Sequence, residues 1–335
     1  MTTNRKFSGE FTDFEAVKME LSKARIQLKT RRANLERNQH NENLSARYID
    51  GIRAEIASLE EKIPKLETIL VTEPPLPELP PRQPLFKVSG VLEEFSVQKV
   101  IGYFTAREYA PEEFAREEAS DQVGSLLLAI TGNAAGSAVT GQSKVRQDDR
   151  CDFVRGKING VLFHGWLGKT HVRVGDYVEM VVMNKDEHYL VYAIMFPALR
   201  TLSITPRCRC GREADIRFGL TYGMPVLASI FLIMLIVFFF QGMDWKGLAI
   251  CAAMFGAILL VVFGYAAWKI KRQPGPVFLL AENIFSTLGF ANPQYVDLRT
   301  LTKVRIKELS SGSPSLTDRD LPSRCSAWVN YFYYY

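Results

Sequence analysis

Apolar residues recur every three or four positions over residues 12–70, which is the period of an amphipathic helix. The sequence Thr12-Asp-Phe-Glu15 has capping-box spacing and predicts the start of a first helix. A polar run at residues 38–43 divides the pattern into two apolar stripes of similar length. The pattern therefore predicts an antiparallel, coiled-coil-like helical hairpin within residues 1–73. Because proline has no N–H to donate, Pro64 is expected to kink or restart the second helix.

The charged positions of these two predicted helices differ in sign. A basic first helix and an acidic second helix favour ion pairs between them and a solvated outer face. Binding of nucleic acid is not expected, because the net charge of the chain is only +5. The charged residues are Lys23, Arg25, Lys29, Arg31, Arg32 and Arg37 on the first helix, and Glu55, Glu60, Glu61 and Glu67 on the second.

Six prolines in residues 74–84 predict a stiff polyproline II linker. From residue 85 to residue 206 the apolar period changes to two, which is the period of half-buried strands. Short strands separated by glycine-rich turns are typical of a small closed β-barrel of the OB or SH3-like type. We expect such a barrel over residues 85–206, with a helical insertion near residues 111–141. The predicted strands are Phe86–Leu92, Val97–Thr105, Cys151–Arg155, Val161–Trp166, Thr170–Met183 and Tyr189–Phe196.

The run Val172-Arg-Val-Gly-Asp-Tyr-Val-Glu179 is typical of a strand, a turn and a second strand. Gly175 is expected to form a bend that a Cβ atom would crowd. Val172, Val174 and Val181 are expected to have buried faces.

Two runs carry no charged side chain, residues 218–240 and residues 248–268. About 20 apolar residues cross the hydrocarbon core of a bilayer, so both runs are predicted membrane spans. The link at residues 241–247 allows only a tight hairpin between them. Basic residues near span ends stay cytoplasmic, and both outer flanks are basic, so both termini are expected in the cytoplasm. The flanking residues are Arg200, Arg207, Arg209, Arg212 and Arg217 before the first span, and Lys269, Lys271 and Arg272 after the second.

Small residues recur at helical spacing in the second predicted span. They favour close helix packing in lipid, either within the hairpin or between copies of the chain in a homo-oligomer. Neither run contains Asp, Glu, Lys, Arg or His, which disfavours a transporter. The small residues are Ala249, Ala252, Ala253, Gly256, Ala257 and Gly264.

The C-terminal part, residues 269–335, is expected to hold cytoplasmic helices and a tail. Apolar positions in Val277–Phe290 predict an amphipathic helix that lies at the membrane surface or on the barrel. The aromatic end Tyr331–Tyr335 is expected to dock on a partner or the bilayer, or to form a disordered tail.

Motifs for nucleotide binding and nucleophilic catalysis fail on spacing. Gly168-Lys-Thr170 resembles the end of a phosphate loop, but Phe163 stands where that loop needs a glycine. Residues 136–141 are mis-spaced for a nucleophile elbow. A third group, which is expected to be an exposed helix face, consists of Glu112, Glu113, Glu117 and Glu118. We therefore expect no enzyme, no catalytic residue and no cofactor.

Five scattered cysteines predict reduced thiols and no disulfide framework. The only close pair, Cys208-Arg-Cys210, lacks the two-residue gap and the second ligand pair that zinc sites usually have. His164, His171 and His188 lie upstream and would reach this pair only through the fold. We expect no metal site.

The barrel and its flank resemble a known family. The segments Gly160-Val-Leu-Phe-His-Gly-Trp166, Val174-Gly-Asp-Tyr-Val-Glu179 and Val191-Tyr-Ala193 precede Pro206-Arg-Cys-Arg-Cys-Gly-Arg212 and two spans. Together, over about residues 85–270, they resemble bacterial inner-membrane proteins named putative type VI secretion system effectors. The resemblance carries no catalytic residues, and it does not separate a toxin from the immunity protein that protects against it.

The resulting expectation is a non-enzymatic protein of the bacterial inner membrane. In a type VI secretion toxin module it would act by membrane insertion or protein binding, as effector or as immunity partner. The alternative is a housekeeping membrane scaffold whose barrel and coiled coil bind other proteins. The expected partners are the lipid bilayer, a second protein and, through the second span, further copies of the chain.

Overall fold

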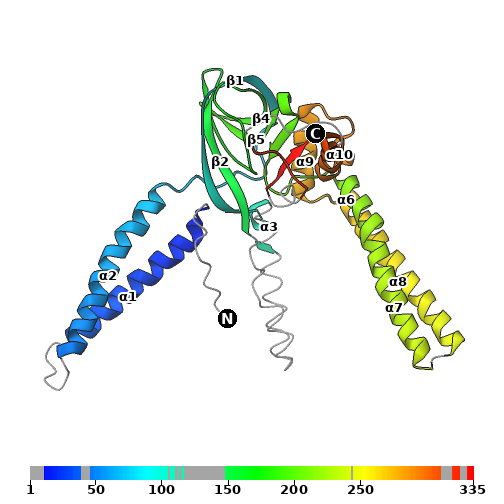
Figure 1. Cartoon of the computed structure of the whole chain (residues 1–335), viewed down its shortest axis with the longest axis horizontal. Coiled ribbons are helices and arrows are strands. Elements are labelled where there is room, and N and C mark those ends of the chain that lie inside the picture. The colour runs from blue at the N-terminus through cyan, green and yellow to red at the C-terminus, as the bar shows by residue number, and fades with distance from the viewer. Residues whose placement is uncertain are drawn as a thin grey trace. The chain divides into compact units, whose positions relative to one another are not determined.

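The computed structural model describes residues 11–38, 46–104, 106–109, 112, 115–116, 148–242, 244–310, 319–324 and 330–335 (Figure 1). Most of the insertion expected at residues 111–141 therefore lies outside the described residues, as do three of the four clustered glutamates. The fourth, Glu112, is exposed. The chain forms two compact units, Met1–Leu76 with Lys99–Gly102, and Pro77–Gln98 with Tyr103–Tyr335.

The first unit is a pair of long helices, α1 (Phe14–Asn38) and α2 (Ala46–Val71). The start of α1 packs on the end of α2, with Val17 and Leu21 against Leu66, so the helices are antiparallel. Helix α2 continues through Pro64 and does not restart there. The expected ion pairs between the basic and the acidic helix are present, at Arg25–Glu67, Arg31–Glu55 and Arg32–Glu60.

The start of α1 is capped by Asp13, one residue later than the capping box predicted. Asp13 Oδ1 accepts a hydrogen bond from the N–H of Ala16 at 3.0 Å, which satisfies one of the free donors of the first turn. Thr12, the expected cap, lies outside the helix and pairs in parallel with Val100.

The second unit contains a sheet with the strand order β3-β2-β1-β4-β5-β6-β7. An additional parallel pairing of β3 with β5 closes β1 to β5 into a mixed barrel. The strands are β1 (Phe86–Tyr103), β2 (Asp148–Ile158), β3 (Val161–Leu167), β4 (Tyr177–Lys185), β5 (His188–Phe196), β6 (Thr201–Ile204) and β7 (Phe332–Tyr334).

Alternating inward positions fill the barrel with apolar side chains. Val154, Phe163, Met180, Val182 and Ile194 are buried in one core cluster. Close packing leaves no room for side chains where backbones meet: a Cβ on Gly165 would lie 2.2 Å from the carbonyl oxygen of Val191 on the parallel neighbour β5. This explains a glycine in the middle of β3.

Four of the predicted strands needed correction. The two strands expected at 86–92 and 97–105 are one long strand, β1. The strand expected at 170–183 begins only at Tyr177, as β4, because residues 170–176 form a loop and a turn. The strand expected at 151–155 extends over Asp148–Ile158.

Gly175 lies in this turn, but not for the reason that the sequence indicated. A Cβ atom there would meet nothing within 4 Å, so the predicted crowding is wrong. The backbone φ of +89° is the actual constraint, since L-residues rarely adopt it. Val172 and Val181 are buried as expected, whereas Val174 is 59% exposed.

The aromatic end of the chain is a strand of the sheet. Strand β7 pairs antiparallel with β6, and the side chains of Tyr331, Phe332, Tyr333 and Tyr334 are buried. The expectation of a disordered tail is therefore wrong. The proline-rich segment also contacts the barrel: Tyr192 donates to the carbonyl oxygen of Glu78 at 2.9 Å.

Two long apolar helices follow the barrel. The first, Arg212–Phe240, joins α6 (Arg212–Phe218), the π-helical turn η2 (Gly219–Gly223) and α7 (Met224–Phe240). The second is α8 (Trp245–Arg272). Both are long and apolar enough to cross a membrane, judged by length and composition.

Shorter helices complete the second unit. Helix α9 (Pro276–Leu288) buries Ala281, Ile284 and Phe285, and it contacts β4, so it packs on the barrel. Helix α10 (Leu298–Ser310) contacts β7, where Tyr334 N–H donates to Thr302 Oγ1 at 3.0 Å.

Candidate functional site: a groove beside the start of the first apolar helix

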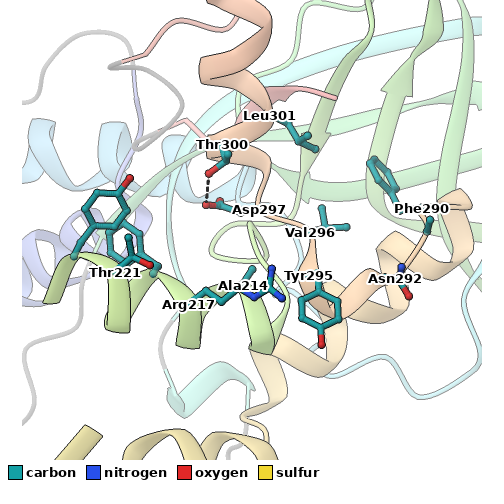
Figure 2. A pocket seen from close by; sticks show the side chains of 13 residues that line it. Ala214, Arg217, Thr221, Phe290, Asn292, Tyr295, Val296, Asp297, Thr300 and Leu301 are labelled. Atoms are coloured by element: carbon teal, nitrogen blue, oxygen red, sulfur yellow. Dashed lines mark hydrogen bonds between the residues drawn. The ribbon is translucent and has the colours of Figure 1, made fainter. Parts of the chain in front are cut away.

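One candidate site is an open groove of about 710 Å³ on the second unit (Figure 2). One wall is α6 with Thr221 and Tyr222 of η2, where the apolar run of the first long helix begins. The opposite wall is the connector between α9 and α10, residues 290–297, together with the first turn of α10. The connector contains a short 3₁₀ turn, η3 (Pro293–Tyr295).

Backbone hydrogen bonds hold the two walls together. Gly211 N–H donates to the carbonyl oxygen of Val296 at 3.0 Å, and Leu298 N–H donates to that of Arg209 at 3.1 Å. A Cβ atom on Gly211 would lie 2.5 Å from the carbonyl oxygen of Pro293. Only glycine lets the connector approach so closely, so Gly211 fixes the base of the groove.

Stacked cations and rings fix the orientation of the side chains in the groove. The guanidinium of Arg217 on α6 lies 4.5 Å from the ring centre of Tyr295 on the connector (Figure 2). The guanidinium of Arg299, on α10, lies 4.5 Å from the ring centre of Phe218. Such cation–π pairs tie α6 to the connector and to α10 from both directions.

The carboxylate in the groove, Asp297, is engaged by its neighbours. Its Oδ1 accepts from the backbone N–H of Arg299 at 3.1 Å and from Arg299 Nε at 3.3 Å. Its Oδ2 accepts from Thr300 Oγ1 at 2.9 Å, the bond drawn in Figure 2. Arg217, by contrast, is exposed and forms no ion pair with any described residue. The groove therefore presents a cation rather than an anion.

The groove lies at a definite level of the two long helices. Phe231 of α7 stacks on Phe255 of α8 with ring centres 3.7 Å apart, and Glu213 of α6 pairs with Lys271 of α8 at 3.2 Å. This antiparallel register sets Arg217 and Phe218 level with the residues around Trp268. Trp268 is exposed and stacks on Tyr265.

A second, more polar cavity of about 320 Å³ lies between Asp148, Asp149, Arg207, Arg209 and Tyr331. Asp149 accepts from Tyr331 Oη at 2.7 Å and from Arg207 Nε at 2.9 Å. Burial raises the pKa of Asp149, and these two donors oppose the rise. This network attaches the end of the chain to β2 and to the segment before α6.

The cysteine pair is internal to the protein. Tyr109, on α3 (Ala106–Tyr109), donates to the carbonyl oxygen of Pro206 at 2.7 Å and lies 3.4 Å from Cys208 Sγ. Burial raises the pKa of the Cys208 and Cys210 thiols to about 12, so both stay protonated at neutral pH. Across the described residues, no three His, Cys, Asp or Glu side chains form a group able to hold a metal ion.

The three barrel histidines lie in two places. His164 and His188 stack with ring centres 4.8 Å apart, while His171 packs on the rings of Phe196 and Phe332.

Gly168-Lys-Thr170 lies in an irregular segment after β3, not before a helix. Lys169 N–H donates to the carbonyl oxygen of Asn330 at 2.6 Å, and Thr170 N–H donates to Asp152 Oδ2 at 2.8 Å.

The groove was missed by sequence reasoning, although part of its signal was present. Gly289 ends α9 with a φ of +86°, and Asn292-Pro293 starts a 3₁₀ turn, which are local signals of a tight connection. The connector approaches Gly211 through Pro293, about 80 positions later in the chain, and no local sequence pattern predicts a contact over that separation.

Comparisons with known proteins add no assignment. No family model, no curated protein and no solved structure matches the chain.

Proposed function

We propose that the chain is a non-enzymatic binding module that two membrane spans hold at the inner membrane of a bacterium. The observation that carries this proposal is the exposed apolar surface of the two long helices. In the most apolar stretch of each helix, 0% and 6% of the residues are buried against the rest of the protein. An unshielded apolar surface of that length is stable in lipid and not in water.

The pairing of β6 with β7 supports a hairpin of two spans. Strand β6 ends at Ile204, before the apolar helices, and β7 begins at Phe332, after them. The two strands share hydrogen bonds in one sheet, so the chain must return to the side from which it left. An even number of crossings satisfies this requirement, and two helices supply it.

The basic flanks support an orientation with the barrel in the cytoplasm. Arg209, Arg212 and Arg217 precede the first apolar run, and Lys269 and Arg272 follow the second. The connection between the two charge-free runs, residues 241–247, holds one acidic and one basic residue, Asp244 and Lys246. The positive-inside rule then sets the flanks, the barrel and the helix pair on the cytoplasmic side.

The same proposal gives the module a role in a type VI secretion toxin system. Its support is the resemblance of residues 85–270 to putative effectors of that system. Acting without a catalytic site, the protein would either insert into the target membrane as an effector or bind a toxin at the inner membrane as its immunity partner. The helix pair and the barrel are the surfaces available for such a partner.

The membrane anchor is tested by alkaline extraction of membranes from cells that express the full chain. The protein should stay in the membrane pellet after carbonate treatment and leave it only in detergent. A matched reference is a soluble barrel protein expressed at the same level. Recovery of the full chain in the carbonate supernatant would contradict the proposal.

The toxin-module role is tested by expression in a sensitive bacterial host. Loss of membrane potential and viability on induction identifies an effector. Survival of a host that co-expresses the toxin encoded beside this protein, together with co-purification of the two, identifies an immunity partner. If the protein neither harms nor protects the host, the housekeeping scaffold replaces the toxin module as the function.

A further inference from the structure

We infer that the groove beside α6 binds the headgroup of an anionic phospholipid from the cytoplasmic leaflet. The inference rests on the proposed function, because it requires the two apolar helices to lie in a bilayer. It assigns a class of ligand to the groove, which membrane anchoring by the two helices does not require.

The first step is the depth of the groove. Phe218 lines the groove and is also the first residue of the charge-free run 218–240. Tyr222, one turn further on, lines it as well and is 58% exposed. When the run 218–240 lies in the hydrocarbon core, the mouth of the groove therefore lies at the headgroup level of the bilayer.

Aromatic residues on the neighbouring helix mark the same level. Tyr265 and Trp268 of α8 are 61% and 55% exposed, and their rings stack 5.9 Å apart. The antiparallel register brings them level with Phe218 and Tyr222. Tyrosine and tryptophan concentrate at the interface between lipid and water. Tyr265 and Trp268 therefore give a second indication, independent of Phe218, that the groove lies at this depth.

The second step is charge. Arg217 lies in the groove, exposed and outside any ion pair among the described residues. Stacking on Tyr295 fixes its guanidinium and leaves the in-plane N–H donors available. Asp297, the acid of the groove, is engaged by Arg299 and Thr300. A fixed guanidinium with open donors matches a phosphate, which accepts two parallel hydrogen bonds.

The third step is the mixed lining. Beyond Arg217, the groove offers the hydroxyl of Thr221 and the amide of Asn292 on one hand, and apolar Phe290, Val296 and Leu301 on the other. A phospholipid has this same division, with polar headgroup oxygens next to apolar chains. A soluble anion would use only the polar part, which leaves the apolar walls without a role.

The test uses the full chain in a neutral detergent and short-chain lipids as probes. Dihexanoyl phosphatidylglycerol is titrated against dihexanoyl phosphatidylcholine, and the midpoint of thermal unfolding is followed. A ligand of the folded state raises that midpoint with concentration. We expect phosphatidylglycerol to raise it at concentrations where phosphatidylcholine does not. Inorganic phosphate and glycerol phosphate should have no effect at the same concentrations.

Variants then locate the binding. Arg217→Gln should weaken binding of phosphatidylglycerol about tenfold, the usual effect of losing a charge-assisted hydrogen bond. Arg217→Lys should lie between it and the wild type, because a lysine keeps the charge and loses the fork. Lys246→Gln removes the same charge at the far end of the hairpin and should change nothing.

Other results overturn the inference. Equal shifts by both lipids would mean an apolar groove without charge selection, and an equal shift by phosphate would mean a site for a soluble anion. Undiminished binding by Arg217→Gln would remove the groove as the site. If Arg217→Gln already unfolds at a lower temperature without lipid, the inference is judged by comparing the two lipids on the wild-type protein. The carbonate extraction above separates these results from failure of the membrane anchor itself.

Discussion

His171 is enclosed by the barrel and the last strand of the chain. Its ring packs 5.5 Å from that of Phe196 and 5.0 Å from that of Phe332. Burial, with the nearby Arg319, lowers its pKa to about 4. The ordinary value, near 6.5, applies to the unfolded chain. Between those values only the unfolded state takes up the proton, so the free energy of unfolding falls as the pH falls.

We therefore expect the melting midpoint to decrease from pH 7 to pH 5, and the decrease to be smaller for His171→Phe. His164, whose pKa is also lowered to about 4 by burial, adds a decrease of the same sign. The double variant His164→Phe with His171→Phe should then show the flattest profile of the three proteins. Thermal unfolding by circular dichroism across this pH range measures it, and parallel profiles for all three proteins would contradict the assignment.

Gly175 offers a second experiment on a single residue. Its N–H donates to the carbonyl oxygen of Leu92 at 2.8 Å while its φ is +89°. A valine there has space but not the backbone conformation, so we expect Gly175→Val to cost about 1–2 kcal/mol or more. Gly175→Asn should cost less, because asparagine tolerates positive φ. Denaturant unfolding compares the two, and equal losses would point to crowding instead.

The contrast between Gly175 and Val174 shows what a local pattern can supply. The alternation of apolar residues correctly indicated that a turn lies here and that Val172 is buried. It made Val174 a strand residue as well, because a loop and a strand with the same apolar spacing look alike in sequence. A glycine can be required by its φ or by a close neighbour. Only the folded backbone shows which of the two applies, and the sequence alone does not.

At the scale of elements, the last strand is the most informative. Tyr333 is fully buried, and its hydroxyl has no hydrogen-bond partner in the described structure. Tyr333→Ala should therefore cost about 3–5 kcal/mol, the usual loss for a large aromatic side chain in a core. Tyr333→Phe keeps the ring and removes an unsatisfied polar atom, so its stability should equal or exceed that of the wild type. Thermal unfolding of the full chain distinguishes the two, and a mild loss for both would mean that the strand is loosely attached.

The helix pair should respond as a unit of its own. Val17 is fully buried between α1 and α2, so Val17→Asp should open the pair by burying an unpaired charge. Hydrogen exchange in α1 and α2 should accelerate, while β4 and β5 keep their protection because they belong to the other unit. Ile26→Asp, on a side chain 64% exposed, is the matched control and should leave both units protected.

These two elements also mark the limit of prediction at this scale. The helix pair was predicted because its signal is a period within one segment. The strand β7 was not, because a run of aromatic residues fits a strand, an anchor and a tail equally well. Its partner β6 lies about 130 residues earlier, and only that pairing decides. Closure of the barrel by β3 and β5 is non-local in the same way.

At the scale of the whole molecule, the topology is the quantity to measure. We expect Lys246→Cys, in the first turn of α8 beside the loop between the apolar helices, to react with a membrane-impermeant maleimide added to intact spheroplasts. Lys157→Cys, on β2, should react only after the membrane is permeabilised. Of the five native cysteines, Cys151, Cys208 and Cys210 are buried and should stay silent in both samples, and Cys251 and Cys325 are replaced by serine in both variants. Labelling of Lys157→Cys in intact spheroplasts would show that the orientation is opposite to the one proposed.

Pairing of β6 with β7 has a consequence for how the protein is made. Translation delivers β6 first, then both apolar helices, and β7 only about 130 residues after β6. The edge of β6 stays open during that interval, and an open edge is a template for unwanted strand pairing. The sheet is therefore finished only after both apolar helices have been translated and have left water. A product that ends between the apolar helices and β7 would keep its sheet edge bare, so completion of the sheet distinguishes chains that include β7 from shorter ones.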